Sequence, residues 1–176
     1  MKFIWIVLIG LLLVSCGYED VNEEITYTDI DGNVYETTDI EGTLWITSDL
    51  RTTSDLDEED LTSYDVDGHD SKLYNLKMVE SMISDGWRLP TPEEWNRLIS
   101  KYPSIESLRE GEFQLSLAGM YDFTGVYQWT DTGCLYLAKD NDGVAYYFYD
   151  GEGESLKKGS FHPKDAFAIR LVKIPE

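Results

Sequence analysis

The stretch that most constrains the fold of this chain is Gly86-Trp87-Arg88-Leu89-Pro90-Thr91-Pro92-Glu93-Glu94-Trp95. Thr91 can cap a helix with its hydroxyl, Pro92 suits the first helical position, and Glu94 can complete a capping box. A helix is therefore expected to begin here.

The large side chains beside this helix start are expected to be structural. Two tryptophans next to a capped helix more often form a packing nucleus than a ligand site, so Trp87 and Trp95 are predicted to be anchors of the core. In so acidic a chain, Arg88 is expected to pair with a carboxylate, which the sequence does not identify.

The first 24 residues have the pattern of a leader and a tether. One lysine precedes an apolar run, Phe3 to Val14, with the length of a secretory signal and not of a spanning helix. The segment Leu13-Val14-Ser15-Cys16 resembles a bacterial lipobox, in which Cys16 becomes the lipidated first residue. We predict a lipoprotein signal peptide over residues 1–15 and a lipidated acidic tether over residues 16–24; an ordinary signal peptide with a chance cysteine is the alternative.

The predicted lipid anchor also indicates a location. Several acyl chains on Cys16 would hold the protein stably at a membrane without spanning it. Gly17 stands where similar lipoproteins that stay at an inner membrane carry an aspartate. The resemblance therefore implies the outer membrane of a cell, with the protein exposed on the outer face.

The charge and cysteine content narrow the possible partners. The formal net charge of −20 argues against nucleic acid and against anionic lipid surfaces, and it favours solubility or cationic partners. With Cys16 lipidated, Cys134 has no second cysteine to pair with. The domain must then be held together by packing and not by a disulfide.

The segment before residue 71 is expected to contain three strands and a loop. Residues 25–28 and 33–38 flank an Asp-Gly turn and predict a β-hairpin. Residues 43–47 predict a third strand that buries either Leu44 and Ile46, or Trp45. From Asp49 to Asp70, nine acidic residues against one arginine predict a long solvated loop.

The remainder predicts helices followed by strands. A helix over residues 72–83, capped by Asp70 or Ser71, would bury Leu73, Leu76, Val79 and Ile83. The second helix is expected to end at Tyr102-Pro103, followed by a short turn over residues 104–109. Strands are predicted at residues 113–117, 126–130, 135–138, 144–149 and 166–172. The fold class is therefore α+β, a single domain with two main helices packed on antiparallel β-sheets.

Six segments of the chain stand in a specific order and spacing: Asp29-Ile30-Asp31-Gly32-Asn33-Val34-Tyr35, Leu44-Trp45-Ile46-Thr47-Ser48-Asp49-Leu50-Arg51-Thr52, Leu73-Tyr74, Gly86-Trp87-Arg88-Leu89-Pro90-Thr91, Gln128-Trp129-Thr130-Asp131-Thr132 and Ala166-Phe167-Ala168-Ile169-Arg170. With these segments the chain resembles the Fibrobacter succinogenes major paralogous (FISUMP) domain family over residues 25–176. The resemblance implies a single C-type-lectin-like domain, a fold shared with formylglycine-generating enzymes.

The chain departs from this family at two positions. Members often have a cysteine before the Gly-Trp-Arg-Leu-Pro segment and another after the terminal arginine, where Ile83 and Leu171 stand here. The resemblance implies that these positions meet, so hydrophobic packing between Ile83 and Leu171 is expected in place of a disulfide.

Three acidic turns, Asp29–Gly32, Asp65–Gly68 and Asp140–Gly143, invite a calcium interpretation. An EF-hand loop needs a bidentate glutamate at its twelfth position, and these turns place Ile40, Leu76 and Gly151 there. Asp and Gly supply the geometry of such turns without a metal. We therefore predict turns and no metal site.

Four residues are candidates for ligand binding. Trp129 and Asp131 lie where lectin relatives have a calcium-binding Trp-Asn-Asp motif, although Thr130 replaces the amide and a core tryptophan is an alternative explanation. Tyr147 and Tyr149 share one face of an aromatic strand, where exposed tyrosines could stack on sugars or contact a protein strand. A strand that is covered on both faces is the alternative.

Catalysis is not expected. Formylglycine-generating enzymes bind copper through paired cysteines, and Cys134 stands alone, so it is predicted to be a small buried hydrophobe. His69 and His162 lack the spacing of a metal pair or of a nucleophile and its base. The sequence predicts a non-catalytic, lipid-anchored envelope module without cofactor that binds a glycan or a surface protein. The alternatives are a structural or adhesin subunit of a surface assembly and, less favoured, an enzyme.

Overall fold

A computed structural model describes residues 25–53, 63–84, 86–139, 144–149, 157–159 and 161–175. Of residues 144–149 and 157–158 it describes the backbone alone. The predicted signal peptide, Cys16, the tether and the turn at 140–143 lie outside the described residues. None of the helices in the described ranges is both long and apolar enough to cross a membrane.

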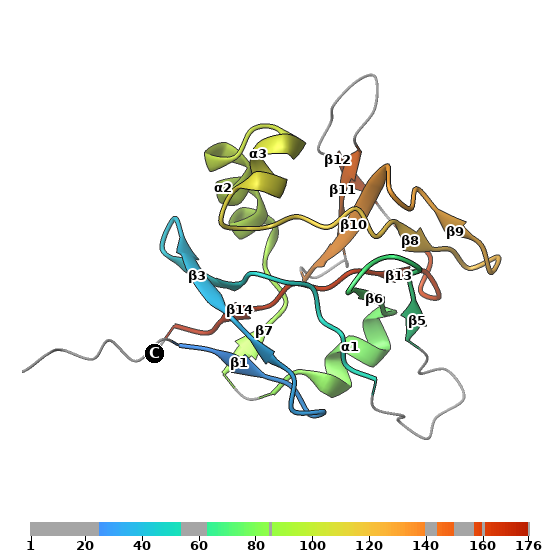
Figure 1. The fold of residues 1–176 in the computed structure, drawn as a ribbon, viewed down its shortest axis with the longest axis horizontal. Coiled ribbons are helices and arrows are strands. Elements are labelled where there is room, and N and C mark those ends of the chain that lie inside the picture. Colours follow the sequence, from blue (N-terminus) through green and yellow to red (C-terminus); the bar gives the residue numbers. More distant parts are fainter. Residues whose placement is uncertain are drawn as a thin grey trace, which may run out of the picture.

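Helices and short antiparallel strands make up the described chain, in agreement with the predicted α+β class (Figure 1). The helices are α1 (Leu76–Met82), α2 (Pro92–Lys101) and α3 (Ile105–Glu110). The strands are β1 (Tyr27–Thr28), β2 (Val34–Tyr35), β3 (Thr37–Ile40), β4 (Thr43–Ile46), β5 (Tyr64–Asp65), β6 (Lys72–Leu73), β7 (Trp87–Arg88), β8 (Met120–Tyr121), β9 (Tyr127–Gln128), β10 (Gly133–Ala138), β11 (Val144–Tyr149), β12 (Lys157–Gly159), β13 (Ala166–Phe167) and β14 (Val172–Lys173).

One four-stranded sheet, in the order β3-β4-β14-β7, joins segments far apart in the sequence. Val172 pairs with Trp45 on one side and with Arg88 on the other. Two other sheets have three strands each, in the orders β10-β11-β12 and β13-β8-β9. Two further sheets, β1-β2 and β5-β6, have two strands each. The predicted first hairpin is confirmed as β1-β2, and the third strand is confirmed as β4.

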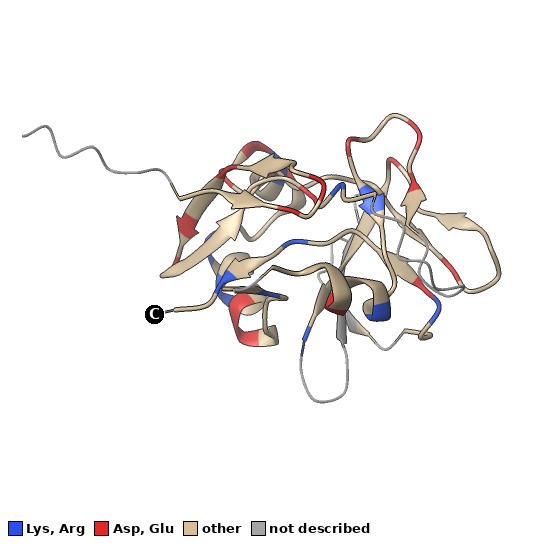
Figure 2. Ribbon diagram, turned by 90° about the horizontal axis from the view of Figure 1, so that it is seen from below, with Lys and Arg blue, Asp and Glu red and all other residues tan. Residues whose placement is uncertain are grey.

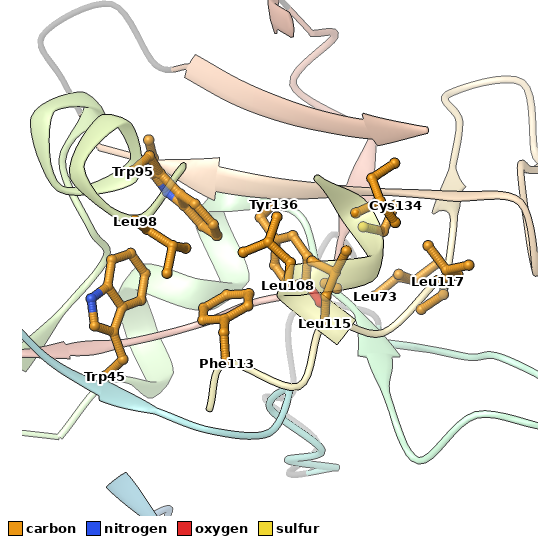
Figure 3. Packing of buried hydrophobic residues seen from close by; sticks show 14 of the residues in the cluster. Trp45, Leu73, Trp95, Leu98, Leu108, Phe113, Leu115, Leu117, Cys134 and Tyr136 are labelled. Atoms are coloured by element: carbon orange, nitrogen blue, oxygen red, sulfur yellow. The ribbon is translucent and has the colours of Figure 1, made fainter. Parts of the chain in front are cut away.

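Strand β4 separates two hydrophobic clusters. Trp45 and Ile46 are adjacent and both buried, and they belong to different clusters. Both faces of this strand are therefore covered, whereas Leu44 is half-buried. Figure 3 shows the cluster around Trp45, which also contains Cys134. The cysteine is 0 % exposed, which confirms the prediction of a small buried hydrophobe, and burial raises the pKa of its thiol well above the usual value.

The predicted start of α2 is confirmed in detail. The Thr91 hydroxyl accepts from the Glu94 N–H at 3.3 Å, and Glu94 Oε2 accepts from the Thr91 N–H at 2.8 Å. Arg88 donates to both carboxylate oxygens of Glu94 at 2.7 Å, so Glu94 is the partner that the sequence left open. Burial raises the pKa of Glu94, but the bonds from Arg88 and Thr91 outweigh it and hold this pKa below its ordinary value.

Trp95 and Trp87, the two expected anchors of the core, differ in how deeply they are buried. Trp95 is fully buried and makes an edge contact with Trp45, with ring centres 5.1 Å apart. Trp87 is half-buried and packs on Tyr27 at 5.2 Å. Leu171 belongs to a hydrophobic cluster against which the half-buried Ile83 packs, and the expected direct contact between the two stays a prediction.

The first predicted helix begins later than expected. Its cap is Asn75, whose side chain accepts from the Met78 N–H at 2.9 Å, and not Asp70 or Ser71. Residues 72–73 form β6 and pair with the nearby β5, and Tyr74 pairs with the distant Phe167, so strand pairing overrides the helical pattern. The buried positions of α1 are Met78, Val79 and Met82.

Three further predictions were wrong in part. The segment after β4 is not simply solvated, because Asp49, Leu50 and Thr52 are buried and residues 64–65 form β5. Residues 113–117 form no strand, since Gln114 has a φ of 52° and the chain turns back to α3. The predicted strands at 126–130 and 166–172 shorten to β9 and to β13 and β14.

The first acidic turn, Asp29–Gly32, is stabilised by hydrogen bonds to the buried carboxylate of Asp29. The Asp29 carboxylate accepts from Asn33, Tyr35 and Thr52 at 2.7–2.9 Å. Burial raises the pKa of Asp29, and these hydrogen bonds outweigh it and lower the pKa below its ordinary value. Gly32 and Gly68 have φ values of 84° and 81°, which confirms the turn interpretation at these two sites.

Candidate binding surface on the β8–β9 hairpin

Strands β8 and β9 form a hairpin that carries a cluster of exposed apolar side chains. We call Phe123, Val126, Tyr127 and Trp129 the hairpin surface; their exposed fractions are 60, 50, 44 and 42 %. Half of the exposed large hydrophobic side chains in the described residues lie between positions 123 and 129. Such a concentration on a monomer is typical of an interaction site, whereas single exposed apolar residues need no explanation.

The turn of this hairpin is preformed by one carboxylate. Asp122 Oδ1 accepts from the backbone N–H groups of Thr124 and Val126 at 2.9 and 3.1 Å, and Oδ2 accepts from the Gln128 amide at 2.9 Å. The side-chain bonds from Thr124 and Gln128 lower the pKa of Asp122 to about 2. The outward direction of Phe123 and Val126 is therefore set before any ligand arrives.

The base of the hairpin is held by aromatic rings and a close backbone approach. Tyr121 stacks on Tyr64 at 3.9 Å and contacts Tyr127 at 4.9 Å. The Tyr127 hydroxyl donates to the Asp65 carbonyl at 2.7 Å. Gly119 has a φ of 73°, and a Cβ there would overlap backbone atoms of β9 and of the turn that follows it. These contacts hold in place the backbone that carries the hairpin surface.

Trp129 and Asp131 lie in the turn between β9 and β10 with left-handed φ values of 58° and 66°. This conformation is uncommon for residues with a Cβ and persists only where the surroundings fix it. The Trp129 carbonyl accepts from Gly133 at 2.8 Å, and the Asp131 N–H donates to Leu117 at 2.9 Å. Trp129 is 42 % exposed, so the alternative of a core tryptophan is wrong.

The other two candidates, Tyr147 and Tyr149, lie on β11. Its register pairs Tyr147 with Leu135 and Tyr149 with Gly133, at the start of β10. Their side chains lie outside the described part, so their contribution to a ligand site stays a prediction.

Sequence reasoning missed two histidines that border the hairpin. His69 Nε2 lies 2.9 Å from Asp131 Oδ1, and its Nδ1 lies 3.2 Å from Ser116 Oγ. The His162 ring packs on Phe123 with centres 4.6 Å apart. His69 is separated from its two partners by 47 and 62 residues, so no spacing in the sequence signals the contact.

A buried polar network lies behind His69. Ser116 Oγ is 3.3 Å from Ser71 Oγ, and Ser71 donates to Asp49 Oδ2 at 2.6 Å. Asp49 also accepts from the Tyr136 hydroxyl at 2.8 Å and from Arg170 Nε at 2.6 Å. A continuous line of polar contacts thus joins Asp131, two residues after Trp129 of the hairpin surface, to the core.

The order Asp131, His69, Ser116 is that of a nucleophilic triad, but its surroundings differ from one. The carboxylate of a triad is buried, whereas the Asp131 side chain is 80 % exposed. The Ser116 hydroxyl also has Ser71 as a neighbour. We therefore interpret the arrangement as a support for Asp131. Among the described residues, no group of three or more His, Cys, Asp and Glu side chains could hold a metal ion.

A hollow of about 310 Å³ is lined mostly by residues of α2, and Figure 1 shows this helix apart from β9. Its cations already have partners, since Arg97 donates to Thr43 at 3.1 Å and Lys101 donates to Glu112 at 3.0 Å. Glu41, Asn96 and Ser100 complete its lining. Because it contains no exposed aromatic ring, it is a weaker candidate than the hairpin surface.

No protein family, curated protein or solved structure was found to match the chain.

Proposed function

We propose that this protein is a non-catalytic binding module of the cell envelope whose hairpin surface binds an uncharged glycan. The observation that carries the proposal is Trp129, an exposed indole fixed in a left-handed turn two residues from an exposed carboxylate. Large aromatic rings are usually buried, so a ring that is held outward in a strained turn favours a role in recognition.

The chemistry of the hairpin surface fits sugar rings. The exposed faces of the Tyr127 and Trp129 rings can pack on the C–H faces of a pyranose, and the Tyr127 hydroxyl stays on the Asp65 carbonyl. The Asp131 carboxylate can accept hydrogen bonds from sugar hydroxyls, and bonds to a charged acceptor are stronger than neutral ones. The chain carries a net charge of −20, which disfavours acidic glycans through repulsion. An uncharged glycan offers the C–H faces and hydroxyl groups that these side chains can bind, and it is not repelled by the acidic chain.

The position of the hairpin fits a surface-anchored protein. Figures 1 and 2 place β9 at one end of the molecule, and β1 and the C-terminal end at the other. Figure 2 also shows acidic residues near both ends. A lipid on Cys16 would join the domain next to β1, through nine residues that reach at most about 30 Å. The hairpin surface would then face away from the membrane.

The anchoring and the finer fold belong to the same proposal. We propose a signal peptide over residues 1–15, lipidation of Cys16, an acidic tether to residue 24, and a C-type-lectin-like domain of the FISUMP type over residues 25–176, exposed at the outer membrane. Metabolic labelling with a palmitate analogue tests the anchor. The wild type should incorporate the label and the Cys16→Ser variant should not, whereas equal labelling of both would contradict the lipid anchor.

Binding can be tested on immobilised β-glucan, mannan and galactan, with acidic pectin as the charged comparison. The wild type should be retained on at least one uncharged polymer and not on pectin. Trp129→Ala should lose that retention, whereas Ile30→Ala, which removes an exposed side chain in the turn between β1 and β2, should keep it. Equal retention of Trp129→Ala and wild type would contradict a glycan site on the hairpin.

A structural or adhesin subunit of a surface assembly is the second candidate. The observation that favours it is another group of exposed apolar side chains near β1 and β2: Ile25, Ile30 and Val34. Co-purification of envelope proteins with the wild type, lost in Ile30→Ala and kept in Trp129→Ala, together with no retention on glycans, would favour this candidate over the first.

A further inference from the structure

His69 connects the hairpin surface to the core, and a count of hydrogen atoms shows how its contacts are directed. Ser71 has one hydroxyl hydrogen, and the 2.6 Å bond to the Asp49 carboxylate uses it. Ser71 therefore has no hydrogen left for Ser116, which lies 3.3 Å away. Any bond between the two serines must be donated by Ser116.

The neutral form of His69 follows from its partner. A carboxylate accepts and does not donate, so the contact of 2.9 Å with Asp131 places the ring hydrogen on Nε2. Nδ1 then has a lone pair, and at 3.2 Å it accepts the hydroxyl hydrogen of Ser116. In this state the Ser116 hydroxyl points away from Ser71.

Protonation reverses one of these bonds. Both ring nitrogens of a charged imidazole are donors, so Nδ1–H must donate to Ser116 Oγ. The Ser116 hydroxyl is released and can donate to Ser71, whose own hydrogen stays on Asp49. The groups facing the ring are the Asp131 carboxylate and the Ser116 hydroxyl, and Ser71, Asp49, Tyr136 and Arg170 lie behind Ser116.

We propose that His69 is a proton-operated switch of the hairpin surface, which favours ligand binding in its neutral form and opposes it when protonated. This inference rests on the proposed glycan site. Both forms of the ring donate from Nε2 to Asp131, but only the charged imidazole strengthens this bond and neutralises the carboxylate that would accept from sugar hydroxyls. Because the side chain of Asp131 is exposed, the expected loss of affinity is moderate, about three- to fivefold.

The switch itself can be tested without a ligand. In the full mature chain labelled with ¹⁵N, long-range correlation spectra of the imidazole, followed over a series of pH values, should show the neutral form of His69 with its hydrogen on Nε2 and the charged form with hydrogens on both nitrogens. Asp131→Asn, which can turn an N–H toward the ring, should remove the preference for Nε2–H. A neutral His69 with its hydrogen on Nδ1, or with an equal mixture of the two forms, would overturn the inference.

The effect on binding uses the same β-glucan, mannan and galactan panel at two pH values at which these spectra show the His69 ring neutral and charged. Retention of the wild type should be three- to fivefold lower where the ring is charged, and that of His69→Gln should not change between the two values. His162→Gln is the matched control, because its ring borders Phe123 and lies outside the network; it should keep the wild-type pH dependence. Wild-type retention that is equal at both values would overturn the switch and leave the glycan site standing, whereas no retention at either value would overturn the glycan site.

Discussion

Arg170 donates from Nε to Asp49 Oδ1 over 2.6 Å, although the two residues are 121 positions apart. Both side chains are 1 % exposed. The remaining guanidinium nitrogens donate to the carbonyls of Ile46, Phe113 and Gln114 at 2.8–3.2 Å. Burial lowers the pKa of Arg170, but the charge of Asp49 outweighs it and raises the pKa above its ordinary value. This pair ties β4, the segment after α3 and the C-terminal strands together.

Loss of one member of this pair should cost more than loss of both. Asp49→Asn leaves a buried guanidinium without its counter-charge and should lower the free energy of unfolding by about 3–5 kcal/mol. The double variant Asp49→Leu, Arg170→Met should recover part of that loss. Urea denaturation measures both. Lys139→Met, which breaks an exposed pair with Glu80, is the control and should cost less than about 1 kcal/mol. A single-variant loss no larger than this control would contradict the role of the pair.

The stability of the β8–β9 hairpin should depend on Gly119 more than on Gly125. Both glycines have left-handed φ values, 73° and 90°, so alanine is strained at either position. At Gly119 an added Cβ would also lie 2.8 Å from the Thr130 N–H nitrogen, whereas at Gly125 the nearest atom is the Tyr121 hydroxyl at 3.4 Å. Gly125→Ala should cost about 1–2 kcal/mol for the backbone alone, and Gly119→Ala should cost more and abolish retention on glycans. Equal unfolding free energies of the two variants would refute this difference.

The hairpin turn should resist acid down to a low pH. The pKa of Asp122 is lowered from 3.8 to about 2, so its contribution to the turn is complete above pH 3.8 and is lost as the pH falls through about 2. Amide proton shifts of Thr124 and Val126, followed from pH 6 to pH 1, should change with a midpoint near 2. Asp122→Asn should remove this transition. A midpoint near 3.8 would show that the carboxylate does not hold the turn.

The two glutamates in the first turn of α2 should differ strongly. Glu94 is buried and bonded to Arg88 and Thr91, whereas Glu93 is exposed. Glu94→Gln should lower the free energy of unfolding by at least about 1 kcal/mol, and Glu93→Gln should change it by less than about 0.5 kcal/mol. Because the pKa of Glu94 is lowered, its contribution is present above its unfolded pKa and fades as the pH falls through the lowered one. Thermal unfolding at pH 7 and pH 3 measures both effects, and equal losses for the two variants would contradict them.

The features that the sequence predicts well are those decided within a few residues. The cap at Thr91, the stop at Tyr102 and the turn at Gly32 depend on neighbours in the chain, and all three are confirmed. The features it predicts poorly depend on distant partners. The helix expected from residue 72 begins only after Tyr74, which pairs with the distant Phe167, and Asp49, expected in solvent, is buried against Arg170.

The candidate site also combines features that are decided by neighbouring residues with features that depend on distant ones. Trp129 and Asp131 could be selected from a local motif, but the exposure of the indole is a property of the turn and of the strands that hold it. The contact of His69 with Asp131 joins two loops 62 residues apart, and one sequence contains no signal for such a pair. Tyr147 and Tyr149 could be placed on a strand, which is confirmed as β11, while their side chains stay a prediction.

The most direct test of the glycan site is the indole N–H signal of each tryptophan during a titration with the polymer that retains the wild type. The mature chain would contain four tryptophans, of which Trp45 and Trp95 are buried, Trp87 is half-buried and Trp129 is exposed. The Trp129 signal should shift and saturate while those of Trp45 and Trp95 stay fixed, and Trp129→Ala should weaken binding by about 30-fold, or about 2 kcal/mol. Saturable binding that leaves the Trp129 signal unchanged would contradict the account.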